Sequence, residues 1–219
     1  MYIQTENGVL IKYTGTDESF TVPAGIKKIG SYAFSRCSSL KRVWLPEGLE
    51  SIGDHAFSIC ESLERIILPD SLTEIGESAF SACRALKSIV IPDNVKEIAM
   101  FAFSECTSLK EVTIGRGVKR IGSGAFAHSY NIRTVTISDE VLFIFSDAFL
   151  GCDGIRKVVI HGTAYSIRDK DPDDLPWPAF LIAESSRADT RPKEPFRFSA
   201  DYPYMDEFEY LNTGGEDDD

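Results

Sequence analysis

The sequence predicts an α/β solenoid made predominantly of short β-strands, in which six 23-residue coils stack on one another. Three regularities predict this fold. Phenylalanine recurs every 23 residues, always after an alanine, at Phe34, Phe57, Phe80, Phe103, Phe126 and Phe149. Cysteine stands three residues after each phenylalanine, except where Ser129 replaces it, and leucine or isoleucine stands six residues after. Columns that stay in phase over residues 29–166 are typical of a repeat array, whose coils bury their core against one another.

Each copy is expected to contain one strand with a single buried face. Val43 and Leu45 alternate with Arg42 and Trp44, and this period of two indicates a half-buried strand. Proline cannot donate a hydrogen bond to a continuing ladder, so it is expected to end the strand. It follows the strand at Pro46, Pro69 and Pro92.

The rest of each unit is expected to be a second extended stretch and a turn. Residues 49–52 predict the extended stretch, Gly53 begins the turn, and residues 56–57 are compatible with a short helical turn. One unit is too small to bury its own phenylalanine. Stacking at the strand spacing of about 4.8 Å brings each apolar side chain onto its counterpart in the next coil.

Charge separates the C-terminal part of the chain from the repeats. The 219 residues have a net charge of −11, and residues 165–219 alone hold 15 acidic and 6 basic side chains. This balance argues against binding to a nucleic-acid backbone, which needs a basic stripe. No apolar run approaches the roughly 20 residues that span a bilayer, and the first residues do not resemble a secretory signal. The sequence as it stands therefore predicts a cytoplasmic protein that is not transmembrane.

The cysteines and histidines are expected to be structural or exposed residues, with no metal site and no cofactor. All five cysteines fall in one repeat column, where a buried thiol behaves as a small apolar side chain. The histidines occupy three different columns, so stacking does not cluster them: His55, His128 and His161. No nucleophile-elbow, zinc-protease or phosphate-loop pattern is present, so no catalytic residue is predicted.

The candidate binding site is the outward face of the predicted strands. If Val43 and Leu45 point inward, Arg42 and Trp44 point outward. An outward tryptophan beside other apolar residues often marks an interaction site, although β-propensity on a solvent face favours the same residue types. The candidate residues on this face are Arg42, Trp44, Arg65, Ile67, Val90, Glu111 and Thr113.

The repeated pattern A-F-x-x-C-x-x-L-x-x-V-x-I-P resembles the BspA-like subfamily of leucine-rich-repeat proteins over residues 29–166. The resemblance implies a curved right-handed superhelix and a role in protein or cell-surface recognition. Residues 7–15 look like the hairpin that precedes the first repeat in that family, so residues 1–28 are assigned to an N-terminal cap and half-repeat. Gly115, Ser138 and His161 replace the strand-ending proline and Phe145 replaces the turn glycine, which predicts less regular final coils.

Beyond the repeats the composition changes. Residues 167–184 include the apolar run 177–183 and are expected to cap the last coil. Residues 185–219 form an acidic tail with aromatic side chains, which either docks to a partner or lies back on the solenoid. The candidate docking residues in it are Tyr202, Tyr204, Phe208 and Tyr210.

The leading functional hypothesis is a non-catalytic protein-interaction module with an unidentified protein partner. A cell-surface adhesin that binds host matrix or glycan is the alternative, and export to the surface fits the family resemblance if a leader precedes this sequence. An enzyme with a site between tail and solenoid would use residues such as His161, Asp169 or Asp171. A purely structural spacer is the remaining possibility.

Overall fold

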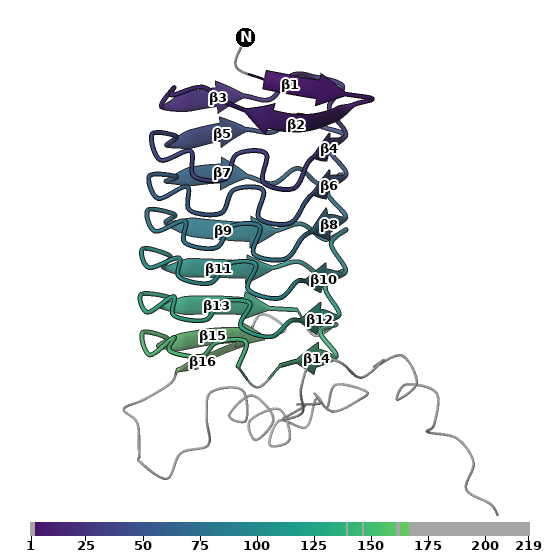
Figure 1. Ribbon diagram of the computed structural model, residues 1–219. Helices are drawn as coiled ribbons and strands as arrows, with labels where there is room; N and C mark the ends of the chain where they lie inside the picture. Colours follow the sequence, from purple (N-terminus) through teal and green to yellow (C-terminus); the bar gives the residue numbers. More distant parts are fainter. Residues whose placement is uncertain (1–2, 139, 146, 161–162, 167–219) are drawn as a thin grey trace, which may run out of the picture.

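The computed structural model describes residues 3–138, 140–145, 147–160 and 163–166. These residues form a β-solenoid of stacked coils, with one long-strand side and one short-strand side (Figure 1). The strands on the first side, here the long ladder, are β3 (Ser19–Thr21), β5 (Arg42–Trp44), β7 (Arg65–Ile67), β9 (Ser88–Ile91), β11 (Glu111–Ile114), β13 (Thr134–Ile137) and β15 (Lys157–Ile160). Those on the second side, here the short ladder, are β4 (Lys28–Ile29), β6 (Ser51–Ile52), β8 (Glu74–Ile75), β10 (Glu97–Ile98), β12 (Arg120–Ile121) and β14 (Phe143–Ile144).

The strands of neighbouring coils pair in parallel and in a register of 23 residues. Val43 pairs with Ile66 on the long ladder, and Ile29 pairs with Ile52 on the short ladder. β9 stops at Ile91 directly before Pro92, as predicted, whereas β5 and β7 stop one residue earlier than predicted, at Trp44 and Ile67. The repeat period therefore sets the hydrogen-bond register as well as the packing.

An antiparallel strand lies at each end of the described solenoid. At the N-terminal end, β1 (Ile3–Glu6) pairs with β2 (Val9–Tyr13), and β2 pairs in parallel with β4. At the other end, β16 (Thr163–Ser166) turns back along β15. An N-terminal hairpin is thus present, but over residues 3–13 and not over 7–15 as expected, while its capping role and the handedness of the superhelix stay predictions. The expected C-terminal cap at 167–184 lies outside the described residues.

The third side of each coil consists of turns, so the expected short helical turn around residues 56–57 was wrong. None of the described residues is helical. The residues two positions before and two positions after the phenylalanines of the first five coils adopt positive φ, as at His55 and Ile59, and this breaks any helix. The same geometry aims alternate N–H groups at the next coil: the Phe57 amide donates to the Ala79 carbonyl at 2.7 Å. The turn side is therefore a third inter-coil ladder.

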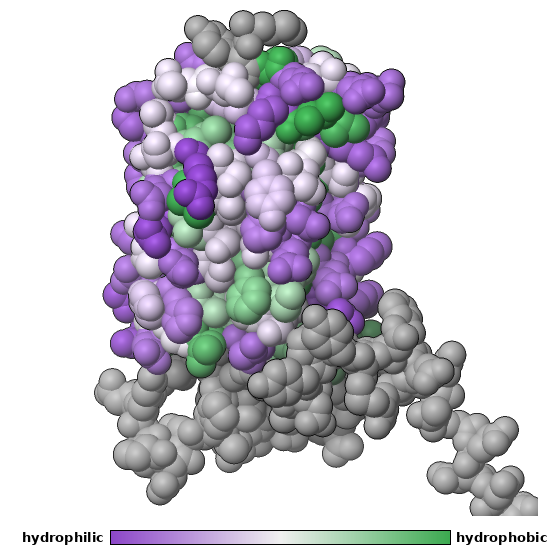
Figure 2. All heavy atoms as spheres, in the orientation of Figure 1, coloured by the Kyte–Doolittle hydropathy of each residue, from purple (hydrophilic) through white to green (hydrophobic). Residues whose placement is uncertain are grey.

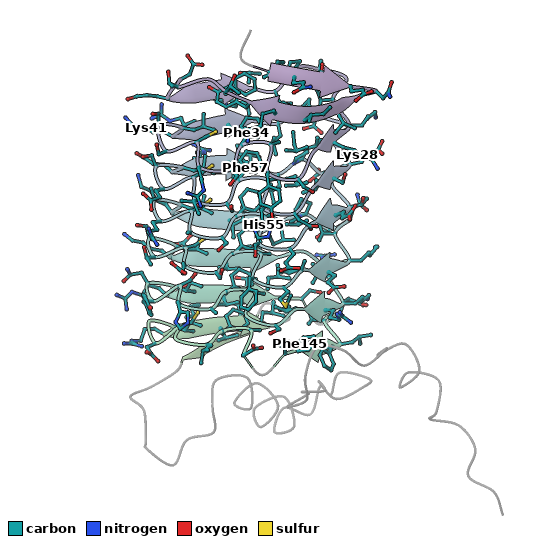
Figure 3. The ribbon with its side chains drawn as sticks, viewed as in Figure 1. Lys28, Phe34, Lys41, His55, Phe57 and Phe145 are labelled. Atoms are coloured by element: carbon teal, nitrogen blue, oxygen red, sulfur yellow. The ribbon has the colours of Figure 1, made fainter. Side chains whose placement is uncertain are left out.

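The core is a continuous column of phenylalanine rings. The ring of Phe34 lies 4.8 Å from that of Phe57 with an interplanar angle of 8°, and each later pair repeats this arrangement. Figure 3 shows the first two rings one above the other inside the coils. Tyr13 of the N-terminal hairpin stacks on Phe34 at 5.1 Å and extends the column. The predicted hydrophobic spine is confirmed.

The departures at Gly115, Ser138 and Phe145 leave the described strand pairing of the last coils regular, which corrects the expectation for these three positions, while His161 lies outside the described residues. β13 and β15 pair over four residues, as many as β9 and β11. Phe145 is buried, packs edge-on against Phe143 at 4.9 Å, and keeps the amide bond to the Ile121 carbonyl that the turn glycines make in other coils. At Gly115, a Cβ would come within 2.5 Å of the Ile91 carbonyl oxygen, so close coil contact selects glycine there.

Phe80→Ala is expected to lower the free energy of unfolding by about 3–5 kcal/mol, because it opens a cavity between two stacked rings. Urea denaturation followed by circular dichroism measures the change. Tyr130→Ala, which removes an exposed aromatic ring, should change stability by less than about 0.5 kcal/mol. Equal melting of the Phe80 variant and the unaltered protein would show that the rings do not stabilise the array.

Candidate functional site

The exposed face of the long ladder carries a short apolar row. Trp44, Ile67 and Val90 stand in consecutive coils, with 48%, 59% and 61% of their surfaces exposed. Trp44 and Ile67 face each other in register. The row ends at Thr113, which is paired with Val90 and only half-exposed. The structure thus places the predicted apolar residues side by side on one surface.

A second row on the same face is polar and charged. Arg42 and Arg65 lie opposite each other in register, and both are exposed. Two coils further along, Glu111 pairs with Ser88 and is also exposed. All seven candidate residues of this face therefore point to solvent at least in part, with positive charge beside the tryptophan.

The two parts of the face belong to separate hydrogen-bonded ladders. β3, β5 and β7 form one sheet, and β9, β11, β13, β15 and β16 form another. The turn side runs through this junction unbroken, because the Phe57 amide bonds to Ala79 and the Phe80 amide to Ala102. Ile67 and Val90 lie on either side of the junction.

The residue column that directly precedes the long strands becomes uniformly basic from β9 onward, and the prediction from sequence overlooked this. In four consecutive coils this column, here the basic column, holds exposed Lys87, Lys110, Arg133 and Arg156. Their main chains are joined in a row, since each amide donates to the carbonyl one coil earlier at 2.9, 2.8 and 3.0 Å. Figure 3 places Lys41, an earlier member of the same repeat column, at the margin of the long ladder. The overall negative charge of the chain gave no sign of this local row of positive side chains.

The 23-residue spacing also pairs opposite charges in neighbouring coils, both earlier in this repeat column and in other columns. Glu18 accepts from Lys41 at 2.7 Å, and Glu64 accepts from Lys87 at 2.7 Å. The Lys87 ammonium group lowers the pKa of the Glu64 carboxyl, chiefly through this hydrogen bond. Lys27 pairs with Glu50, and Arg84 with Glu61, in the same way. Figure 2 shows hydrophilic side chains along both margins of the coils.

The cysteine column is structural, as predicted, but it also forms hydrogen bonds. All five thiols are free. Each of the four buried ones donates to the carbonyl of the phenylalanine 26 residues earlier, at 3.1, 3.2, 3.3 and 3.0 Å for Cys60, Cys83, Cys106 and Cys152. Each of these four carbonyls also accepts the amide of the residue three positions later, so the thiol is its second donor. The column therefore contributes polar contacts as well as packing.

Ser129 performs the same task where the cysteine is missing. Its hydroxyl donates to the Phe103 carbonyl at 3.0 Å and accepts from the Cys106 amide at 3.1 Å, and the residue is fully buried. The exchange of cysteine for serine thus preserves a donor at this position.

Ser129→Ala is expected to cost about 1–3 kcal/mol of stability, because the buried Cys106 amide and Phe103 carbonyl lose their partner. Ser129→Cys is the matched control, since it restores the donor that the other coils use, and it should cost less. Thermal or urea unfolding of both variants measures the difference. Equal destabilisation by the two substitutions would argue against the hydrogen bond.

The thiols are shielded from reaction. Burial raises the pKa of Cys60, Cys106 and Cys152 to about 12. Burial also raises the pKa of half-buried Cys37, against the opposing charge of Lys12. Cys37 lines a small polar pocket with Lys12 and Arg36. It is the thiol most open to solvent.

A thiol reagent at pH 8 is expected to modify Cys37 in the native protein and the other four cysteines only after unfolding. The raised pKa values also predict alkaline destabilisation. Each buried thiol stabilises the fold below its unfolded pKa, near 9.0, and this stability is lost as pH rises towards about 12. Rapid modification of two or more thiols without loss of structure would contradict the buried column.

The other candidate residues form no reactive cluster in the described structure. The ring of His55 stacks on Tyr32 at 4.7 Å, and His128 is exposed. His161, Asp169 and Asp171 lie outside the described residues, as do the tail residues Tyr202, Tyr204, Phe208 and Tyr210. Within the described ranges, no group of three or more His, Cys, Asp or Glu side chains is placed to hold a metal ion.

Comparison with known proteins decides the family. The model of the BspA type leucine rich repeat region matches six copies, over residues 12–98 and 82–170. The chain belongs to the BspA-type leucine-rich-repeat family. The Phe, Cys and Leu columns of the BspA-type coils are therefore a family pattern, and the family assignment expected from the repeat is confirmed.

Solved structures of bacterial leucine-rich-repeat proteins share this architecture. A protein of Treponema pallidum is 32% identical, with a TM-score of 0.69 over 74% of this chain and 80% of its own. A leucine rich cell surface protein of Faecalibacterium prausnitzii is 27% identical, with a TM-score of 0.50. The match covers 71% of this chain and 35% of that protein. The pneumococcal vaccine antigen PcpA is 25% identical, with a TM-score of 0.53. The match covers 71% of this chain and 45% of that protein.

This chain thus spans less than half the length of the last two proteins. No curated protein matches its sequence. In the described part of the chain, no helix has the length and apolar character required to cross a membrane.

Proposed function

We propose that this chain is a non-catalytic interaction module that binds a protein partner through the exposed face of the long ladder. The observation that carries the proposal is the row of Trp44, Ile67 and Val90 beside Arg42 and Arg65. Tryptophan and arginine are the residues most enriched among those that dominate binding energy at protein interfaces. Family membership supports the same role.

The scaffold supports tight binding because the side chains are already in place. Trp44 and Ile67 project from strands that are hydrogen-bonded in register, above a stacked aromatic core. A surface that is ordered before binding loses little conformational entropy when a partner docks. Glu111 and Thr113 extend the contact surface into the next coils, where the exposed row becomes polar.

A cell-surface adhesin is the second candidate. The observation that favours it is the likeness to a cell surface protein and to a vaccine antigen, both bacterial. In that role the same face would bind host matrix or glycan in place of a protein from the same cell. An enzyme site between tail and solenoid receives no support from the described residues, and neither does a role as a mere spacer, which would not need an exposed tryptophan.

The double variant Trp44→Glu/Ile67→Glu is expected to weaken binding of the partner at least 100-fold, because two apolar contacts are replaced by charges that must be desolvated. A partner captured on the intact chain, from cell lysate or from host extracellular material, is purified and titrated against each variant by calorimetry. Unchanged circular dichroism verifies the fold.

Leu142→Glu/Leu150→Glu is the matched control, since both leucines are exposed but lie outside the long ladder. It should leave affinity unchanged. If the Trp44/Ile67 variant binds as tightly as the control, the binding site lies elsewhere. A captured glycan or matrix protein in place of a cellular protein would favour the adhesin.

A further inference from the structure

From Lys87 onward, the basic column departs from the pairing of opposite charges seen in the rest of the described solenoid. Among the described residues, five inter-coil ion pairs join opposite charges 23 residues apart, and two of them, Lys41–Glu18 and Lys87–Glu64, lie earlier in this same repeat column. In the basic column, by contrast, Lys87, Lys110 and Arg133 follow one another at the same spacing with the same sign. Like charges stacked at the coil spacing repel one another, and a negatively charged partner would relieve that repulsion.

Within the described solenoid, Lys87 is the member of the basic column that a carboxylate neutralises, through its ion pair with Glu64. Arg133 donates to the Gly154 carbonyl at 3.3 Å and Arg156 to the Asp153 carbonyl at 2.9 Å, so both bond to main-chain oxygens. Among the described residues, no carboxylate forms an ion pair with Lys110, Arg133 or Arg156. Lys157, also exposed, adds a further positive charge at the last coil.

The same chain carries a segment of matching chemistry. Residues 198–219 contain eight acidic side chains and no basic one. Aromatic residues alternate with these acids at Phe198, Tyr202, Tyr204, Phe208 and Tyr210. Acidic groups complement the lysine and arginine side chains that precede β9, β11, β13 and β15, and aromatic groups complement a ladder whose earlier strands β5 and β7 expose Trp44 and Ile67.

The chain leaves the solenoid beside the stripe. Ser166, the last described residue, pairs with Lys157 in the β15–β16 register. The basic column covers three coil steps, about 14 Å at the usual strand spacing. Residues 167–197 supply 31 residues of connection, and an extended chain spans about 3.3 Å per residue. Reach therefore does not limit contact between the acidic segment and any part of the long ladder.

We infer that the acidic segment 198–219 docks along the basic column of its own chain, with its carboxylates against Lys110, Arg133 and Arg156 and its aromatic rings on the adjoining strand face. The docked segment then competes with an external partner where the two surfaces meet, at Glu111 and Thr113 of β11. The competition rests on the proposed function, whereas the docking rests on the charges alone.

Zero-length carbodiimide coupling of the full chain tests the docking, because the reagent joins a carboxylate to a lysine amine only when they touch. Peptide mapping by mass spectrometry is expected to find Lys110 and Lys157 joined to acids within residues 201–219. The pairs Lys41–Glu18 and Lys87–Glu64 are internal standards, since both are 2.7 Å ion pairs of the solenoid. Raising the salt to about 1 M should reduce the tail cross-links at least fivefold, since screening then acts over about 3 Å.

Arg133→Glu/Arg156→Glu reverses the centre of the stripe while leaving both lysine acceptors in place. It should lower the yield of tail cross-links at least fivefold with the internal standards unchanged. Lys28→Glu/Lys96→Glu makes the same change in net charge away from the long ladder, on exposed residues, and should have no effect. Figure 3 shows Lys28 on the opposite side of the coils from Lys41.

Three results would overturn the inference. Tail cross-links spread equally over Lys28, Lys96 and Lys110, or unaffected by the arginine reversals, would show that docking is unspecific. Cross-linked dimers that vanish on dilution would place the segment on a second copy. A DNA 20-mer that binds through Arg133 and Arg156 while no tail cross-links form would assign the stripe to an external polyanion. None of these results affects the outcome of the Trp44/Ile67 affinity test. Failure of the docking inference can therefore be distinguished from failure of the proposed function.

Discussion

The stacking of one phenylalanine ring per coil is the constraint on which the rest of the structure depends. A 23-residue coil cannot enclose a phenylalanine by itself, and burial of that ring is worth about 1.5–3 kcal/mol only when the next coil covers it. Ring centroids 4.8–5.4 Å apart hold the coils at the spacing that the two strand ladders and the turn ladder also need. Apolar packing and main-chain hydrogen bonding therefore agree on one register, and each reinforces the other.

Sequence periodicity could predict the core, the strands and the outward face, because all three follow from which residues recur and which alternate. It could not predict the turn side. Residues with no preference for positive φ, such as Ile59 and His55, adopt it there because inter-coil amide bonds require that geometry. Nor did it find the role of Ser129, since composition does not reveal which carbonyl needs a donor. Phe145 replaced a turn glycine without harm because Phe143 and Arg120 pack around its ring.

The candidate site was predicted only in part, and for a physical reason. Strand alternation identifies Trp44 and Ile67, which lie within strands, but Lys110 lies just before one and so escapes that test. The sequence did contain the necessary information. Comparing the charge of equivalent positions in successive coils, and not only their hydropathy, would have identified the basic column. Two surfaces of different character thus adjoin on one ladder: an apolar row, which supplies contact area, and a basic column, which selects for charge. An overall net charge of −11 conceals the second.

The fixed spacing of 23 residues determines which changes in chain length this architecture tolerates. Ring stacks, thiol bonds and ion pairs all join a residue to one in an adjacent coil, so loss or gain of a whole coil preserves the partnerships elsewhere. A single inserted residue inside a coil would shift every later column of that coil against its neighbours. Evolution by duplication of complete units follows naturally, and it accounts for relatives that share these coils yet differ greatly in length.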